Sequence, residues 1–72
     1  MRITYDAEVD VLYICFSETT VTIEHLTESI AADYDENGRL AGIEILDAFQ
    51  QFQDARTLRQ VILENVGVSI PA

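Results

Sequence analysis

Residues 33 to 44 read Asp33-Tyr34-Asp35-Glu36-Asn37-Gly38-Arg39-Leu40-Ala41-Gly42-Ile43-Glu44, and the prediction of the fold depends on this segment. Two incompatible structures fit it. As a β-hairpin, Asn37-Gly38 supplies the two positive-φ residues of a type I′ turn between strands of alternating polarity. As a calcium loop, it matches the pattern D-x-[DN]-x-[DN]-G-x5-E at every specified position.

The hairpin reading also predicts its own register. With a two-residue loop, the inner strand pairs are apolar and share one face: Tyr34 with Ala41, Ala32 with Ile43, and Ile30 with Ile45. The opposite face then carries a mostly polar set: Ala31, Asp33, Asp35, Leu40, Gly42 and Glu44. A shift of one residue scrambles this separation. A three-residue loop with Gly38 as a bulge is the alternative turn.

The calcium reading needs a different backbone on both sides of the loop. Its ligands are Asp33, Asp35, Asn37, the Arg39 carbonyl and a bidentate Glu44. It also requires a helix before the loop, over residues 23 to 32, and another after it. A calcium loop of this kind normally pairs with a second one, which the chain does not contain, and the N-terminal third is rich in β-formers. We therefore expect the hairpin and keep the calcium site as the alternative.

Two further segments read as strands before the hairpin. Residues 2 to 5 alternate, with Ile3 and Tyr5 on one face. The run from Val11 to Phe16 is apolar in both alternating sets, which is typical of a central strand with cover on both faces. A third strand is expected near residues 20 to 24.

After Leu46 the pattern becomes helical. Residues 47 to 55 predict one turn or an irregular bridge, and a longer helix follows from Thr57 to about Val66. Thr57 with Gln60 forms a capping box. Gly67 is placed as the left-handed residue after the helix, where Val68 could contact Leu63. We expect this helix to cover the sheet face that bears Ile43 and Ile45.

The expected fold class is α+β, a small antiparallel β-meander of about five strands with one C-terminal helix packed on one face. Residues 1–72 form a single domain, with the meander in 1–48 and a helical C-terminal extension in 49–72. A chain this short leaves a marginal core. Oligomerisation is the most plausible source of extra stability.

Two blocks of sequence carry a family resemblance. They are Tyr5-Asp6-Ala7-Glu8-Val9-Asp10-Val11-Leu12-Tyr13-Ile14 and the run from Asp33 to Ala48. Together they resemble the small prokaryotic family catalogued as domain of unknown function 2283. The resemblance covers residues 1 to 48 and implies a small antiparallel sheet. It implies no catalytic residues.

The charge is strongly acidic and unevenly placed. The chain has thirteen acidic residues, four arginines and no lysine, for a net charge of −9, and residues 54 to 72 are neutral. Phosphate binding needs a basic patch, so we expect no nucleic-acid partner and no anionic membrane. A basic protein partner suits this surface.

The remaining chemistry is sparse, and we expect no enzyme and no cofactor. Cys15 reads as a small core residue, and His25 as a solvent-facing or interface histidine. We expect Asp33 and Glu44 to share the open face of the hairpin as a solvated acid pair. No stretch is long and apolar enough to span a membrane, and no signal-peptide core opens the chain, which favours the cytoplasm.

The sequence thus predicts a non-catalytic acidic interaction module, with neutralisation of a basic toxin-like protein as one role. We expect a homo-oligomer, a dimer or higher. Its interface candidates are Leu12, Ile14 and Phe16, because a single helix cannot cover both faces of the sheet. Calcium binding by the loop Asp33 to Glu44 is the alternative function.

Overall fold

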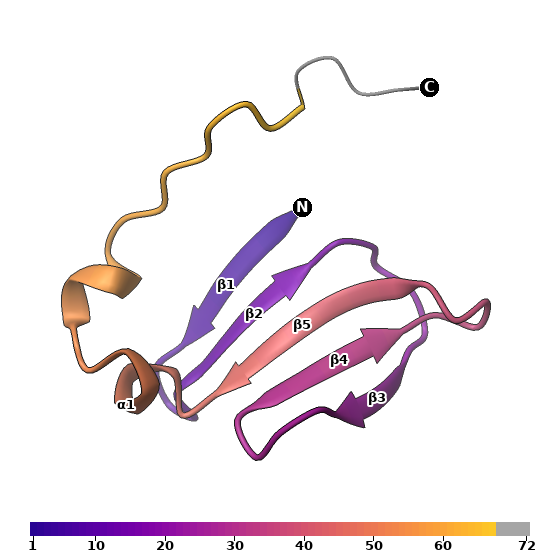
Figure 1. Ribbon diagram of the computed structural model, residues 1–72, viewed down its shortest axis with the longest axis horizontal. Coiled ribbons are helices and arrows are strands. Elements are labelled where there is room, and N and C mark those ends of the chain that lie inside the picture. The colour runs from indigo at the N-terminus through magenta and orange to yellow at the C-terminus, as the bar shows by residue number, and fades with distance from the viewer. Residues whose placement is uncertain (68–72) are drawn as a thin grey trace.

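The computed structural model describes residues 1–67, which form one twisted antiparallel sheet followed by two short helical turns (Figure 1). The strands are β1 (Arg2–Asp6), β2 (Val11–Cys15), β3 (Thr22–His25), β4 (Ile30–Tyr34) and β5 (Leu40–Leu46). The helical elements are α1 (Ala48–Phe52) and the 3-10 turn η1 (Ala55–Leu58). The expected contact of Val68 with Leu63 lies outside the described residues.

The strand order is β1-β2-β5-β4-β3, so the predicted meander is wrong. Strand β5 lies between β2 and β4, and β2 to β5 form a Greek-key arrangement. The polarity of the strands explains the order. β2 is apolar on both sides and takes an interior position, as predicted, whereas β3, with the sequence Thr-Ile-Glu-His, is exposed throughout and forms an edge.

The hairpin of β4 and β5 confirms most of the predicted register. Ala32 opposes Ile43 and Ile30 opposes Ile45, but Tyr34 opposes Leu40 and not Ala41. The register shifts between Asp33 and Tyr34, which leaves Ala41 as the extra residue of a bulge. The carbonyl of Ala41 instead accepts hydrogen bonds from the N–H groups of Phe16 and Ser17, at 2.8 and 3.1 Å.

The turn itself is the three-residue alternative. The N–H of Asp35 donates to the Arg39 carbonyl at 2.9 Å, and the N–H of Gly38 donates to the Asp35 carbonyl at 3.0 Å. Gly38 has a φ of 76°, whereas Asn37 is not left-handed, so the predicted type I′ turn is wrong. The Asp35 side chain explains the choice. Its Oδ1 accepts from the N–H groups of Asn37 and Arg39, both at 2.9 Å, which favours a type I turn followed by a glycine bulge.

The same strands remove the backbone that the calcium reading required. Residues 30–34 and 40–46 are strands and not helices, and the segment before them contains β3 and a turn. The expected β-hairpin is therefore confirmed, and the helix-loop-helix alternative does not form. The alternation of large apolar residues in β5 favours the hairpin over the helix-loop-helix, because that alternation matches a strand and not a helix.

The predicted helix from Thr57 to Val66 is also wrong. Asp54, and not Thr57, caps the local turn, because its side chain accepts from the Arg56 N–H at 2.9 Å, and this places Thr57 inside η1. Residues 59–67 then continue without regular secondary structure, and we call them the C-terminal arm. A helix of about ten residues needs tertiary packing to hold it, and the arm has little. The single helical turn predicted within 47 to 55 is confirmed as α1.

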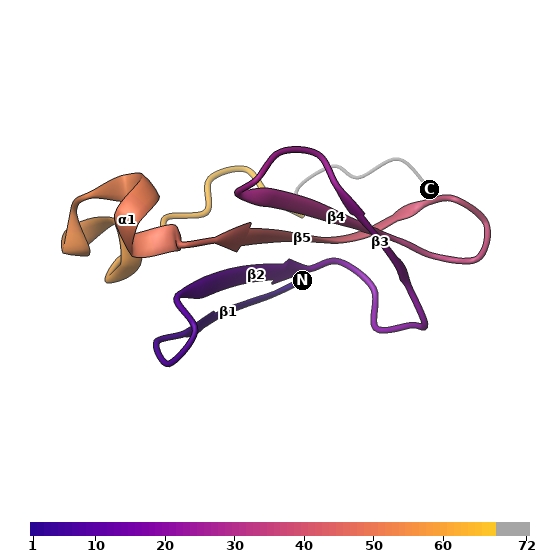
Figure 2. The ribbon, with the colours of Figure 1, turned by 90° about the horizontal axis from the view of Figure 1, so that it is seen from below.

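The sheet forms one layer that nothing covers completely. Seen along its edge, it is a single twisted layer with α1 at one end (Figure 2). Among the described residues the buried side chains are small, with one charged exception: Cys15, Ala31, Ala32, Ala41, Ala48 and Asp33. No large side chain in this part of the chain is fully buried. The large apolar residues therefore line surfaces and do not fill a core.

Candidate interaction surface

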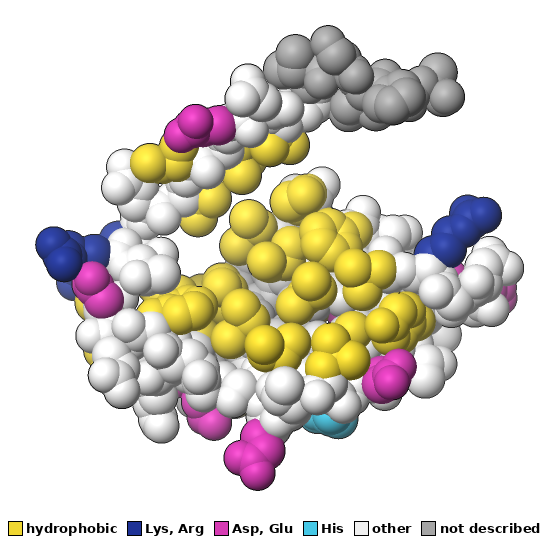
Figure 3. All heavy atoms as spheres, viewed as in Figure 1, with side chains coloured by type: hydrophobic (Ala, Val, Ile, Leu, Met, Phe, Trp, Pro, Cys, Tyr) yellow, Lys and Arg dark blue, Asp and Glu magenta, His cyan; other side chains and the backbone are white. Residues whose placement is uncertain are grey.

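Cross-strand pairing gathers the large aliphatic residues on one side of the sheet. Residues directly opposite one another in a ladder point to the same face. Six such pairs run across four strands: Ile3 with Ile14, Tyr5 with Leu12, Leu12 with Ile45, Ile14 with Ile43, Ala32 with Ile43, and Ile30 with Ile45. We call this set, completed at the β4 and β5 ends by Tyr34 opposite Leu40, the apolar face. Figure 3 shows it as a broad hydrophobic patch over the sheet.

The apolar face is open to solvent. Ile3 and Tyr5 are 37% exposed, Ile30 is 38% exposed and Leu40 is 44% exposed. The central members Leu12, Ile14, Ile43 and Ile45 are half-buried. Contiguous apolar patches of this kind mark interaction sites in soluble proteins.

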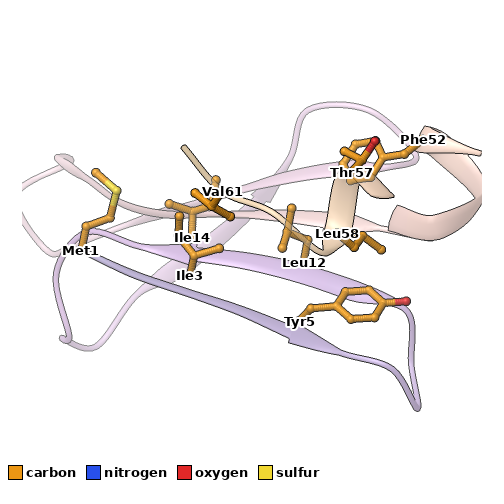
Figure 4. Close-up of a pocket in the computed structure, with 9 residues that line it drawn as sticks. All are labelled: Met1, Ile3, Tyr5, Leu12, Ile14, Phe52, Thr57, Leu58 and Val61. Atoms are coloured by element: carbon orange, nitrogen blue, oxygen red, sulfur yellow. The ribbon is translucent and has the colours of Figure 1, made fainter. Parts of the chain in front are cut away.

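A hollow lies between the β1 side of this face and the C-terminal segment. Its volume is about 540 Å³, and no charged side chain lines it. The sheet contributes Met1, Ile3, Tyr5, Leu12 and Ile14, and the C-terminal segment contributes Phe52, Thr57, Leu58 and Val61 (Figure 4). The hollow is thus an apolar groove with two walls from distant parts of the sequence.

The predicted interface residues fall on or beside this surface. Leu12 and Ile14 belong to the apolar face, and Phe16, which follows β2, is 39% exposed. Arg56, in η1, pairs with Asp54 at 3.0 Å on an exposed site. The pairing of Arg56 contributes to the cap of η1 and not to the groove.

Asp10 fixes the end of the groove, a role that the sequence analysis missed. Its Oδ1 accepts from the Tyr5 hydroxyl at 2.6 Å and from the Phe49 N–H at 2.8 Å, and its carbonyl accepts from the Ala48 N–H at 2.9 Å. Asp10 therefore caps the first turn of α1 from a distant part of the chain. The Tyr5 hydroxyl first, and then the Phe49 N–H, lower the pKa of Asp10. The sequence signal for this role was an acidic residue, Asp10, at the end of the turn between β1 and β2.

The other side of the sheet is polar, and it carries five ionisable side chains. We call Tyr13, Cys15, His25, Asp33 and Glu44 the polar cluster. Tyr13 opposes Glu44, Cys15 and Asp33 both oppose Gly42, and His25 opposes Ala31, so all five share this face. The expectation that Asp33 and Glu44 share a face is confirmed. His25 lies exposed in β3, and Cys15 is a buried free thiol.

Tyr13 lies directly over Gly42. A Cβ atom at Gly42 would stand 2.9 Å from both Cε1 and Oη of Tyr13, and 3.0 Å from the carbonyl oxygen of Ile14. Glycine is therefore the residue that lets the ring approach the backbone. A hydrogen bond with Cys15, then burial, then Asp33 raise the pKa of Tyr13 to about 12.

Asp33 is the one charged side chain that the described sheet buries. It is 3% exposed, and its Oδ1 has no hydrogen-bond partner. Burial raises the pKa of Glu44, and the neighbouring Asp33 raises it further through a hydrogen bond and its charge. His25 acts in the opposite sense on Glu44. The Glu44 carboxyl group therefore holds its proton more tightly than an exposed glutamate does.

The alternative metal ligands are not brought together. Asp33 lies on β4 and Glu44 on β5, while the Asp35 carboxylate is engaged with the backbone of its own turn. Within residues 1–67, no group of three or more His, Cys, Asp or Glu side chains is close enough to hold a metal ion. The calcium ligand set of the alternative interpretation therefore does not form in this part of the chain.

Comparison with known proteins identifies the family. The family model described as "Protein of unknown function (DUF2283)" matches residues 2–48, and the chain belongs to this family. No curated protein and no solved structure matches the chain. The family match spans the whole sheet and ends at Ala48, where α1 begins, so the C-terminal arm lies beyond it. Among residues 1–67, no helix has the length and hydrophobicity that crossing a membrane requires.

Proposed function

We propose that this protein is a non-catalytic interaction module that works as a homodimer through its apolar face. The observation that carries the proposal is the absence of any fully buried large side chain within the described residues. A domain that buries only alanine, cysteine and one aspartate lacks the core that a stable monomer needs. A second subunit on the apolar face supplies that core.

The energy available from this pairing is substantial. Five large residues on or beside the apolar face keep about two fifths of their surface exposed: Ile3, Tyr5, Phe16, Ile30 and Leu40. Complete burial of such a side chain contributes about 1.5 to 3 kcal/mol, so covering the exposed part gives roughly 3 to 6 kcal/mol per subunit. That contribution is comparable with the total stability of a small domain.

The partner of the dimer is proposed to be a basic protein. The net charge of −9 resides in residues 1 to 53, and the apolar face is bordered by acidic residues that stay outside the subunit contact. An acidic surface accelerates association with a basic partner and selects against acidic ones. Neutralisation of a basic toxin-like enzyme is the role that we put forward. A cytoplasmic location is part of the same proposal, because the lone thiol of Cys15 suits a reducing compartment.

Light scattering at micromolar concentration tests the dimer. The expected mass is twice the 8.1 kDa of the chain, and Ile14→Asp should dissociate or unfold the dimer, because it would bury an unpaired carboxylate. Phe16→Asp should act in the same direction. Val9→Asp is the matched control, because Val9 is 62% exposed in the turn between β1 and β2 and should leave the mass unchanged. A monodisperse wild-type monomer would refute the proposal.

Affinity capture from the source cell tests the partner. The dimer should retain a basic protein at low ionic strength and release it as salt is raised, because exposed charge pairs are screened. Retention that is insensitive to salt, or retention of acidic proteins only, would count against a charge-selected partner.

A further inference from the structure

We infer that the C-terminal arm of each subunit packs onto the apolar face of the other subunit, so that the dimer is closed by two exchanged arms. This inference rests on the proposed function and names the segment of the second copy that completes the site. The starting point is the arm itself. Its four large apolar residues are more than half exposed: Val61 at 60%, Ile62 at 68%, Leu63 at 63% and Val66 at 59%.

The arm and the apolar face are complementary in chemistry. Both are almost uncharged, since the arm contains one arginine and one glutamate, and the groove lining contains no charged residue. The groove lining therefore brings no charged side chain into the contact. Hydrophobic side chains along the arm gather on the side that looks towards the sheet, across open space (Figure 3). The two surfaces face each other but do not close on each other within one chain.

The short helical elements hold the arm away from its own sheet. α1 is tied to the sheet end by Asp10, and its C-cap residue Gln53 has a left-handed φ of 54°. The Asp54 cap then forms η1, from which the arm departs. Among residues 1–67, no backbone hydrogen bond ties positions 60 to 67 to a strand. The hollow of about 540 Å³ between arm and sheet is the result.

The arm adds apolar surface to that of the sheet. The apolar face runs across four strands. The arm brings four more large apolar residues, Val61, Ile62, Leu63 and Val66. Burial of both surfaces in one dimer stabilises it more than burial of the apolar face alone.

The length of the arm suits exchange. Two sheets that pack face to face lie about 10 Å apart. Residues 59–67 span up to about 30 Å when extended, which is enough to cross from one sheet to the other. In a two-fold dimer each arm meets the apolar face of the partner, and the same contact occurs twice, so the assembly closes.

Disulfide trapping between different chains tests the exchange. All variants carry Cys15→Ala so that the native thiol cannot react. One chain carries Ile3→Cys on β1, and another, with a purification tag that changes its size, carries Val61→Cys on the arm; both positions line the hollow (Figure 4). Mixed and oxidised, they should give a cross-linked species that contains one chain of each kind. If Val61→Cys fails to fold, the same experiment is performed with Leu63→Cys on the arm.

Two controls separate this inference from the dimer itself. Thr19→Cys, in the exposed loop after β2, should not cross-link to the arm. The mass of the uncross-linked mixture is measured in parallel by light scattering. Arm exchange would be overturned, and the dimer retained, by a dimeric mass without mixed cross-links together with one further result. That result is a chain carrying both cysteines that forms its disulfide within itself, as a monomer. A monomeric mass would overturn both.

Discussion

Gly42→Ala is the substitution whose cost follows most directly from the geometry. The added Cβ would stand 2.9 Å from the Tyr13 ring and 3.0 Å from the Ile14 carbonyl oxygen. Overpacking of this kind costs about 1 to 3 kcal/mol. Restriction of the unfolded chain returns about 0.4 to 1 kcal/mol. With the middle of each range, the expected net loss of stability is about 1.3 kcal/mol. A loss of this size lowers the melting temperature of a domain of 60 to 100 residues by roughly 5 to 10 °C.

Thermal and urea unfolding at one fixed protein concentration measure this loss, since the stability of a dimer depends on concentration. In a Tyr13→Val background most of the clash is removed, so the penalty of Gly42→Ala should largely disappear. Gly38→Ala is the matched control. Its Cβ would meet no atom within 4 Å, and its cost comes from a φ of 76°, so Tyr13→Val should not change it. A Gly42→Ala penalty that is zero, or equal in both backgrounds, would refute the packing of Tyr13 on Gly42.

Glu44→Gln should stabilise the protein at neutral pH. The folded state raises the pKa of Glu44 above 4.5, so the wild-type protein loses stability as the pH rises from 4.5 through the folded-state pKa. Urea unfolding of Glu44→Gln at a series of pH values should not show this loss of stability. The contribution of Asp10 to stability is present above pH 3.8 and is lost as the pH falls through the lower folded-state pKa of Asp10. Asp10→Asn should therefore lack this loss of stability in acid. It should also speed amide hydrogen exchange at Phe49. Absorbance titration should show one tyrosine ionising near pH 12 that is missing in Tyr13→Phe. Gly38→Val should lower the melting temperature, because a β-branched residue resists a positive φ, and an unchanged midpoint would contradict the turn assignment.

Local sequence patterns predicted the structural features that depend on residues close together in the chain. The pairs Ala32 with Ile43 and Ile30 with Ile45 followed from alternation over a few residues on either side of a turn. The interior place of β2 followed from its apolar residues on both faces. The turn type failed because the Asp35 side chain, and not the Asn-Gly pair, organises the loop.

Features that depend on distant residues were beyond the same reasoning. The insertion of β5 beside β2 joins segments about thirty residues apart, and nothing in either segment names its neighbour. The bond between Asp10 and the Phe49 N–H spans 39 positions. The Thr57 capping box lost to Asp54, three residues earlier, which is a competition between two adequate caps. The apolar face was anticipated through Leu12 and Ile14, but its groove depends on where the arm departs.

The strand order also bears on how the chain reaches its fold. β1 with β2, and β3 with β4 and β5, pair between consecutive segments, so both units can form early from local contacts. A single seam, the pairing of β2 with β5, joins them. We therefore expect assembly in two stages, with closure of that seam limiting the folding rate. A chain divided in the loop between Cys15 and Thr22 should yield two fragments that recombine, each bringing one side of the seam.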